Sequence, residues 1–159
     1  MTGAEPAAED AVVRQIEGFV TGGPAGIRRG LTDLGWSPRP GIADSVIDTV
    51  WTNPAAGGGV RAHTGERTDG YFVGLIANVA DDRAAWALRE RMAARIADPL
   101  RSAQLRPGPP TGERSMTWSD EHLWVELSVL PEIRHDTHTL PAAVQFAMRP
   151  CPARTPVVQ

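Results

Sequence analysis

The sequence predicts a single α+β domain in which helices pack on a mostly antiparallel sheet, in the order α-α-β-β-β-α-β-β(-β). Two helical runs near the N-terminus precede a series of strand-like runs. A long amphipathic helix opens at Asp81 or Asp82, and the segment after it alternates apolar and polar residues as a hairpin does. Antiparallel hairpins on either side of a helix favour this class over a parallel nucleotide-binding sheet.

The first predicted helix spans residues 9–20, because apolar side chains recur there at helical spacing. A second, shorter helix carries Ile27 and Leu31 and ends at Gly35, which suits the left-handed residue that follows many helices. Residues 37–41 contain two prolines and are expected to form a connector.

Three strands are expected before the long helix, at residues 46–51, 60–63 and 71–79. Glycine-rich and polar stretches at 53–59 and 65–70 separate them. The third strand is apolar at both of its alternating sets of positions. It is therefore expected to be central and covered on both faces.

The long helix has a buried stripe and a capped N-terminus. Asp81 or Asp82 is expected to cap it. The stripe consists of Ala85, Leu88, Met92 and Ile96. Pro99 is expected to interrupt the helix, with Asp98 capping a fresh turn.

The C-terminal third predicts a hairpin and one further strand. Residues 114–118 and 123–130 alternate around a polar turn and form the hairpin. Residues 106–112 and 132–139 are expected to be loops, and residues 144–148 form the optional last strand of the order given above.

Length and composition indicate one domain, at residues 9–148, between a disordered tail at 1–8 and a proline-rich tail at 149–159. A chain of 159 residues buries enough surface to fold without a metal or disulfide. The net charge of −3 indicates neither a nucleic-acid partner nor an anionic membrane. No apolar run approaches the ~18 residues of a spanning helix.

Cysteine and lysine usage limit the chemistry. Cys151 is the single cysteine, so no intramolecular disulfide can form, and this fits a cytoplasmic location. No signal peptide is expected, because residues 1–10 lack an apolar core. All 16 cationic residues are arginine, so no lysine can form a Schiff base.

Three stretches of the chain resemble the DUF6301-like family of uncharacterised actinobacterial proteins, which in turn resembles the type III secretion chaperone-like fold. They are Leu31-Thr32-Asp33-Leu34-Gly35-Trp36, Asp81-Asp82-Arg83-Ala84-Ala85 leading into Leu88-Arg89-Glu90, and Pro110-Thr111-Gly112-Glu113-Arg114 running into Trp118. The resemblance implies a chaperone-like α+β fold and a partner-binding role. It implies no functional residue, because the family has no agreed activity.

No cofactor or metal site is predicted. His135 and His138 lie near Glu132, but in a loop and without a second cluster that would complete a zinc site. Cys151 stands between prolines with no base positioned by the sequence. The glycines at 57–59 lack the lysine and hydroxyl residue of a phosphate-binding loop.

The five tryptophans give the clearest binding candidates. Trp36 and Trp118 are expected to fill the core. Trp51, Trp86 and Trp124 depart from the apolar stripes, and any of them that is exposed would anchor a partner or line a groove.

Two functions stay open. The first is a non-catalytic, chaperone-like or immunity-like accessory module that binds a protein or peptide, with a homodimer also open. The second is a small tailoring enzyme or cyclase that acts on a peptide or natural product by acid–base chemistry, with His63, Glu66, Glu126 and His135 as its candidate groups. A closed pocket joining a histidine to a carboxylate would favour the enzyme, and an open apolar patch without such a pair would favour binding.

Overall fold

The computed structural model describes residues 5–22, 27–41, 43, 45–56, 59–67, 70–108 and 114–150. These residues form three α-helices, an eight-stranded antiparallel sheet and a separate two-stranded hairpin, which confirms the α+β class. None of the helices in these ranges is long and apolar enough to cross a membrane. The helical elements are α1 (Glu5–Gly22), α2 (Ile27–Asp33), the short 3-10 helix η2 (Pro54–Ala56) and α3 (Asp82–Ser102).

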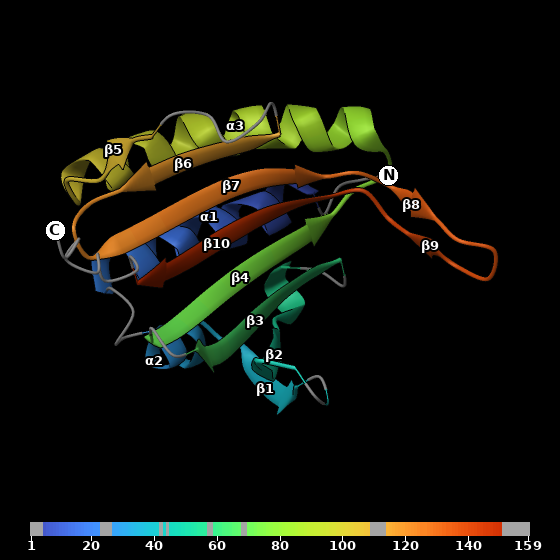
Figure 1. Cartoon of the computed structure of the whole chain (residues 1–159), viewed down its shortest axis with the longest axis horizontal. Coiled ribbons are helices and arrows are strands. Elements are labelled where there is room, and N and C mark those ends of the chain that lie inside the picture. Colours follow the sequence, from blue (N-terminus) through green and yellow to red (C-terminus); the bar gives the residue numbers. More distant parts are fainter. Residues whose placement is uncertain are drawn as a thin grey trace, which may run out of the picture.

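The sheet has the strand order β1-β2-β3-β4-β10-β7-β6-β5. Its strands are β1 (Ser37–Pro40), β2 (Ile47–Thr52), β3 (Val60–Arg67), β4 (Gly70–Asn78), β5 (Arg106–Pro107), β6 (Ser115–Ser119), β7 (Leu123–Leu130) and β10 (Ala143–Pro150). The separate hairpin consists of β8 (Ile133–Arg134) and β9 (Thr139–Leu140), and it projects beyond the end of the sheet (Figure 1).

The last strand of the described chain joins two halves of the sheet. Strands β1 to β4 follow one another on one side, and β5 to β7 follow one another on the other, while β10 lies between β4 and β7. Phe146 of β10 lies opposite Leu75 of β4 and opposite Leu127 of β7. The strand predicted as optional is therefore the centre of the sheet.

The helices cover one face of this sheet. Figure 1 shows α1 behind β7 and β10, and α3 along β6, while no helix of the described residues crosses the face toward the viewer. Phe19 of α1 stacks on Phe146 at a ring-centroid distance of 6.5 Å, and both side chains are fully buried. The predicted stripe of α3, from Ala85 to Ile96, is buried in the same core. The hydrophobic core thus lies entirely between the helices and one sheet face.

Strand β4 is central but is covered by helices on one face only, so the prediction of two covered faces was wrong. Val73 and Leu75 are buried toward the helices. Phe72 and Ile76 point to the other face, where they are half-buried. An apolar run on both faces also suits a strand whose second face meets a partner.

Helix α2 ends as Gly35 predicts. Gly35 has φ +93°, its N–H donates to the carbonyl of Thr32 at 3.1 Å, and the N–H of Trp36 donates to the carbonyl of Leu31 at 2.9 Å. This pair of bonds is the Schellman motif, which satisfies carbonyls that the helix leaves free.

Helix α3 is capped by Asp81, whose Oδ1 accepts a hydrogen bond from the N–H of Ala84 at 2.8 Å. The predicted break at Pro99 was wrong, because the helix continues to Ser102. A proline removes only one intrahelical donor, and the buried side chains of Ile96 and Leu100 hold both sides of Pro99 against the core.

The edges and ends of the fold extend slightly beyond the prediction. Helix α1 begins at Glu5, inside the expected tail 1–8, because Pro6 is tolerated in a first helical turn. Residues 37–40 form the edge strand β1 instead of a connector, and prolines are acceptable at a sheet edge. The remaining predicted tail positions, 1–4 and 151–159, lie outside the described residues.

One polar side chain of the core has no partner. Gln15 of α1 is fully buried, and neither its Oε1 nor its Nε2 has a hydrogen-bond partner among the described residues. A buried amide without a partner destabilises the fold by about 1–3 kcal/mol.

Replacing Gln15 with Met is expected to raise the free energy of unfolding by about 1–2 kcal/mol, because it removes an unpaired amide and keeps a flexible chain of similar size. Urea denaturation measures the change. Arg14→Met, at an exposed position of the same helix, is the control for helix propensity. A loss of stability in Gln15→Met would contradict the prediction and indicate an ordered water on the amide.

Helix α3 ends with a second Schellman motif, but its left-handed residue is Gln104, with φ +65°. Gln104→Gly is expected to raise the free energy of unfolding by about 1 kcal/mol, because a left-handed residue with a Cβ is strained. Gly35→Ala is the reverse test and should lower it by about 1 kcal/mol. A Cβ at Gly35 would lie 3.8 Å from the nearest atom, so the backbone alone would cause the loss. Thermal or urea unfolding of both variants checks the pair.

Candidate functional site

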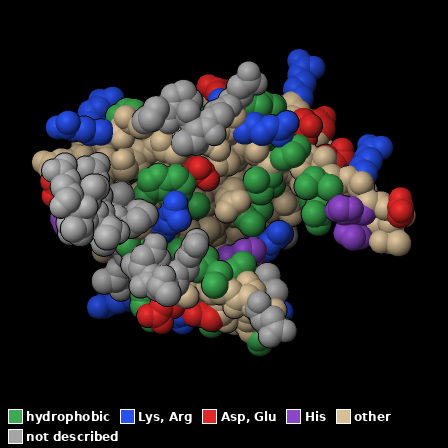
Figure 2. All heavy atoms as spheres, viewed as in Figure 1, with side chains coloured by type: hydrophobic (Ala, Val, Ile, Leu, Met, Phe, Trp, Pro, Cys, Tyr) green, Lys and Arg blue, Asp and Glu red, His purple; other side chains and the backbone are tan. Residues whose placement is uncertain are grey.

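The candidate functional site lies on the sheet face opposite the helices, which is called the helix-free face below. Strand alternation and the pairing register assign residues to it. Its charged and imidazole groups are Arg39, Arg61, His63, Arg106, Glu126 and Arg149. Its larger apolar side chains include Val50, Phe72, Ile76, Trp124 and Leu130. Figure 2 shows hydrophobic and basic side chains intermingled over the centre of this face.

Small residues occupy the centre of the helix-free face. Gly74 of β4 lies opposite Ala147 of β10, so two adjacent central positions have almost no side chain. His63 of β3 lies beside Gly74, and Glu126 of β7 lies beside Ala147, in the same cross-strand row. Three strand spacings separate the Cα atoms of His63 and Glu126 by about 14 Å. The row forms a floor of two small residues between two titratable groups.

His63 is a neutral hydrogen-bond acceptor in this arrangement. The Nε of Arg61 donates to Nε2 of His63 at 3.3 Å, which places the imidazole proton on Nδ1. Burial lowers the pKa of His63 below its ordinary value, and the positive charge of Arg61 lowers it further.

Arg149 and Trp124 form the opposite corner of the floor. The Arg149 guanidinium lies over the Trp124 ring, 4.4 Å from its centroid. The Nε of Arg149 is buried without a hydrogen-bond partner among the described residues. Neither Arg149 nor Arg61 forms an ion pair with a described carboxylate. Trp124 is half-buried on this face, and its role in binding stays a prediction.

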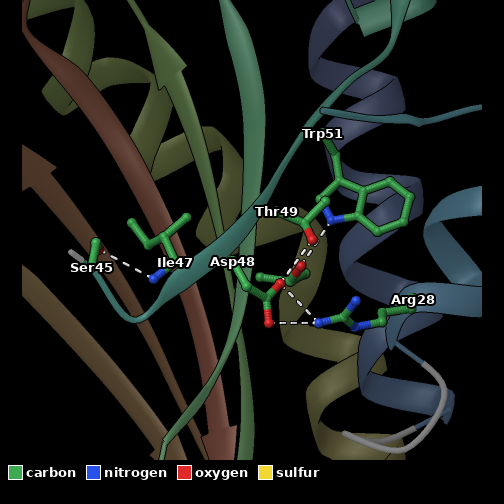
Figure 3. Close-up of polar contacts among 7 residues, drawn as sticks. Arg28, Ser45, Ile47, Asp48, Thr49 and Trp51 are labelled. Atoms are coloured by element: carbon green, nitrogen blue, oxygen red, sulfur yellow. Dashed lines mark hydrogen bonds and ion pairs between the residues drawn. The ribbon is translucent and has the colours of Figure 1, made fainter. Parts of the chain in front are cut away.

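Trp51 is not exposed, so the condition for its predicted role in binding is not met. It is 4% exposed, and its Nε1 donates to Oγ1 of Thr64 at 2.8 Å. Figure 3 shows Trp51 on the helix side of β2, near Arg28 of α2, whose Nη2 donates to both carboxylate oxygens of Asp48 at 2.8 Å. The tryptophan therefore belongs to the core.

The remaining tryptophans, Trp36, Trp86 and Trp118, lie in the core or on a helix. Trp36 and Trp118 are buried, which confirms their predicted place in the core. Trp86 is half-buried on α3, and the Arg89 guanidinium covers its ring at 4.6 Å from the centroid. Trp86 belongs to the helix layer and is therefore separate from Trp124 and the helix-free face.

The four catalytic candidates do not converge. Glu66 is exposed and points to the helix side of β3, opposite to His63, because residues three apart on a strand face opposite ways. His135 lies on the projecting β8–β9 hairpin, exposed, with its ring 4.8 Å from the His138 ring. The described residues contain no group of three or more side chains that could hold a metal ion.

A cavity of about 210 Å³ lies on the helix side of the molecule, between α1, α3 and the adjoining ends of β3 and β4. Its walls are mainly apolar, and its ionisable lining residues are Glu9 and Arg91, which form an ion pair at 3.3 Å. None of the predicted catalytic or binding residues lines this cavity, so it holds no histidine–carboxylate pair.

Comparison of the chain with known protein families, with curated proteins and with solved structures found no match in any of the three. The resemblance to the DUF6301-like family stays a prediction. Sequence reasoning did not single out Arg61 and Arg149, which the structure adds to the candidate site. Alternation within β3 and β10 could have placed them on one face, but only the pairing of β10 with β4 brings that face together.

The lowered pKa of His63 predicts a pH dependence of stability. The unfolded chain takes up a proton near pH 6.5, whereas folded His63 takes it up only at lower pH. The free energy of unfolding should therefore fall as the pH drops through 6.5, and His63→Gln, which keeps an acceptor for Arg61, should fall less. Urea denaturation at pH 7.5 and 5.5 measures the difference between the two proteins. His122→Gln, at an exposed turn, is the control, and an identical pH slope in wild type and His63→Gln would disprove the prediction.

Proposed function

We propose that this chain is a non-catalytic accessory module that binds a protein or peptide partner on the helix-free face. The observation that carries the proposal is the composition of that face. Half-buried apolar side chains, including Phe72, Ile76 and Trp124, stand among guanidinium groups that have no carboxylate partner in the described chain. Solvated sheet faces are usually polar throughout, whereas aromatic residues and arginine are enriched where proteins bind one another.

The chaperone-like resemblance also supports a binding role, because it implies an α+β fold that acts by holding a partner. A sheet face is a broad and rigid platform, so a partner bound there would lose little affinity to reordering of the module. This platform suits an extended segment or a flat protein surface better than a small molecule, which needs a deep pocket.

The alternative of an acid–base enzyme receives less support. His63 and Glu126 share a row across the small floor, but His63 already accepts a hydrogen bond from Arg61, and its lowered pKa makes it a weaker base. Catalysis would also require exclusion of water, which an open sheet face does not provide. The pair that the enzyme hypothesis requires is therefore not preformed.

Selection from a random library of twelve-residue peptides on phage is expected to yield binders whose affinity depends on the helix-free face. Ile76→Gln should weaken these peptides at least tenfold, because it removes an apolar contact beside the floor. Fluorescence anisotropy with the labelled synthetic peptides measures the dissociation constants. Leu34→Gln, at another partly exposed apolar residue, is the matched control.

Circular dichroism and urea unfolding establish that both variants fold. Equal weakening in Ile76→Gln and Leu34→Gln would place the peptides elsewhere and contradict the proposal. Selected peptides that bind both variants as tightly as wild type would contradict it as well. A parallel incubation of the protein with candidate peptides, followed by mass spectrometry, tests the enzyme alternative, for which cleavage or cyclisation is the expected result.

A further inference from the structure

We infer that the helix-free face recognises an acidic, extended segment of the partner, with two carboxylates held by Arg61 and Arg149. This inference rests on the proposed function and adds the chemistry of the partner to it. It starts from the charge on the helix-free face, where the described side chains include four arginines and a single glutamate. The described charges of this face are therefore net positive, whereas the chain as a whole carries a net charge of −3.

The charge separation follows from which acidic residues are already paired. Glu9 and Asp10 of α1 form ion pairs with Arg91 and Arg95 of α3, so acids on the helix side neutralise helix-side arginines. The arginines at the centre of the helix-free face have no comparable partner among the described residues. A carboxylate of another chain would form ion pairs with these arginines.

The two central arginines are held in defined positions. The Nε of Arg61 donates to His63, which leaves its terminal nitrogens for a ligand. The guanidinium of Arg149 lies over the Trp124 ring, 4.4 Å from its centroid. A planar guanidinium binds a carboxylate through two parallel hydrogen bonds, and a fixed plane lowers the entropy lost on binding. Arg61 and Arg149 are thus prepared for anions, whereas a mobile surface arginine is not.

The register sets the spacing of the two anchors. Arg61 lies opposite Ile76, which lies opposite Gln145, and Arg149 is four residues further along β10. Two strand spacings and four residues of rise separate the Cα atoms of Arg61 and Arg149 by about 16 Å. The Nε of Arg61 contacts His63, which lies in a cross-strand row two residues nearer to Arg149. The Arg61 side chain therefore shortens the span along the strands to about 13 Å, the distance between residues i and i+4 of an extended peptide.

The floor between the anchors fixes the residue in the middle. Gly74 and Ala147 carry no side chain larger than a methyl group between Phe72 and Ile76, and the Gln145 amide lies 3.7 Å from the position that a Cβ of Gly74 would take. Side chains i, i+2 and i+4 of an extended segment point to the same side. The segment that fits has acidic residues at i and i+4 and an apolar residue at i+2 that packs over these two small residues.

The first arm of the test uses the composition of the selected peptides. Twelve-residue phage peptides that lose affinity for Ile76→Gln are expected to be enriched in Asp or Glu at positions four apart. Peptides that depend on the face but show no acidic enrichment would overturn this inference and leave the proposed function standing. The absence of any face-dependent peptide would overturn both.

The second arm uses charge variants with the strongest synthetic peptide. Arg61→Gln and Arg149→Gln are each expected to raise its dissociation constant at least tenfold, and Arg149→Lys by less, since lysine keeps the charge. Arg29→Gln is the matched control, because it makes the same charge change on exposed α2. Arg61→Gln leaves the Trp124 contact intact, so it stays informative if the Arg149 variants unfold.

Two results would overturn the inference in this arm. The first is an equal loss in Arg29→Gln and Arg61→Gln, which would indicate long-range charge attraction alone. The second is a peptide whose two acids can be replaced by glutamine without loss of affinity. A twenty-nucleotide single strand serves as the polyanion probe. If it binds more tightly than the peptide and depends on Arg61, the face recognises phosphates and the acidic-peptide inference is wrong.

Discussion

The entry of β10 between β4 and β7 is the constraint on which the rest of the structure depends. The strands before it form two separate antiparallel units, which the sheet joins only through β10. Phe146 and Met148 of β10 are fully buried and pack in the core that α1 covers. The sheet therefore becomes continuous only when β10 pairs with segments that lie up to 75 residues earlier in the chain, as Met148 does with Val73.

The insertion of β10 between β4 and β7 also assembles the helix-free face. It sets Ala147 beside Gly74 and brings Arg149 onto the face that carries Arg61. The helices and their core occupy the opposite face, so no other layer of the described residues covers the apolar side chains on this one. The proposed binding role rests on topology more than on any local motif, because the residues concerned come from strands that are far apart in sequence.

The site was predicted in part. His63, Glu126 and Trp124 are on the helix-free face, but Glu66 and His135 are elsewhere. Trp51 was predicted as a candidate binding residue but is buried in the core. Strand β2 shifts its register between Ile47 and Thr49, and each such irregularity reverses which residues face the core. Composition and alternation do not reveal a bulge, so the burial of Trp51 could not be read from them.

The sequence by itself determined the features that neighbouring residues control: the α+β class, the Asp81 cap, the Gly35 terminus and the buried stripe of α3. These depend on interactions between residues close along the chain, and a periodic pattern records them. Only the tertiary structure decided the central place of β10, the continuity of α3 through Pro99 and the meeting of Arg61 with Arg149 on one face. Each depends on packing or pairing between distant segments, where the free energy of burial and of sheet formation outweighs local preference.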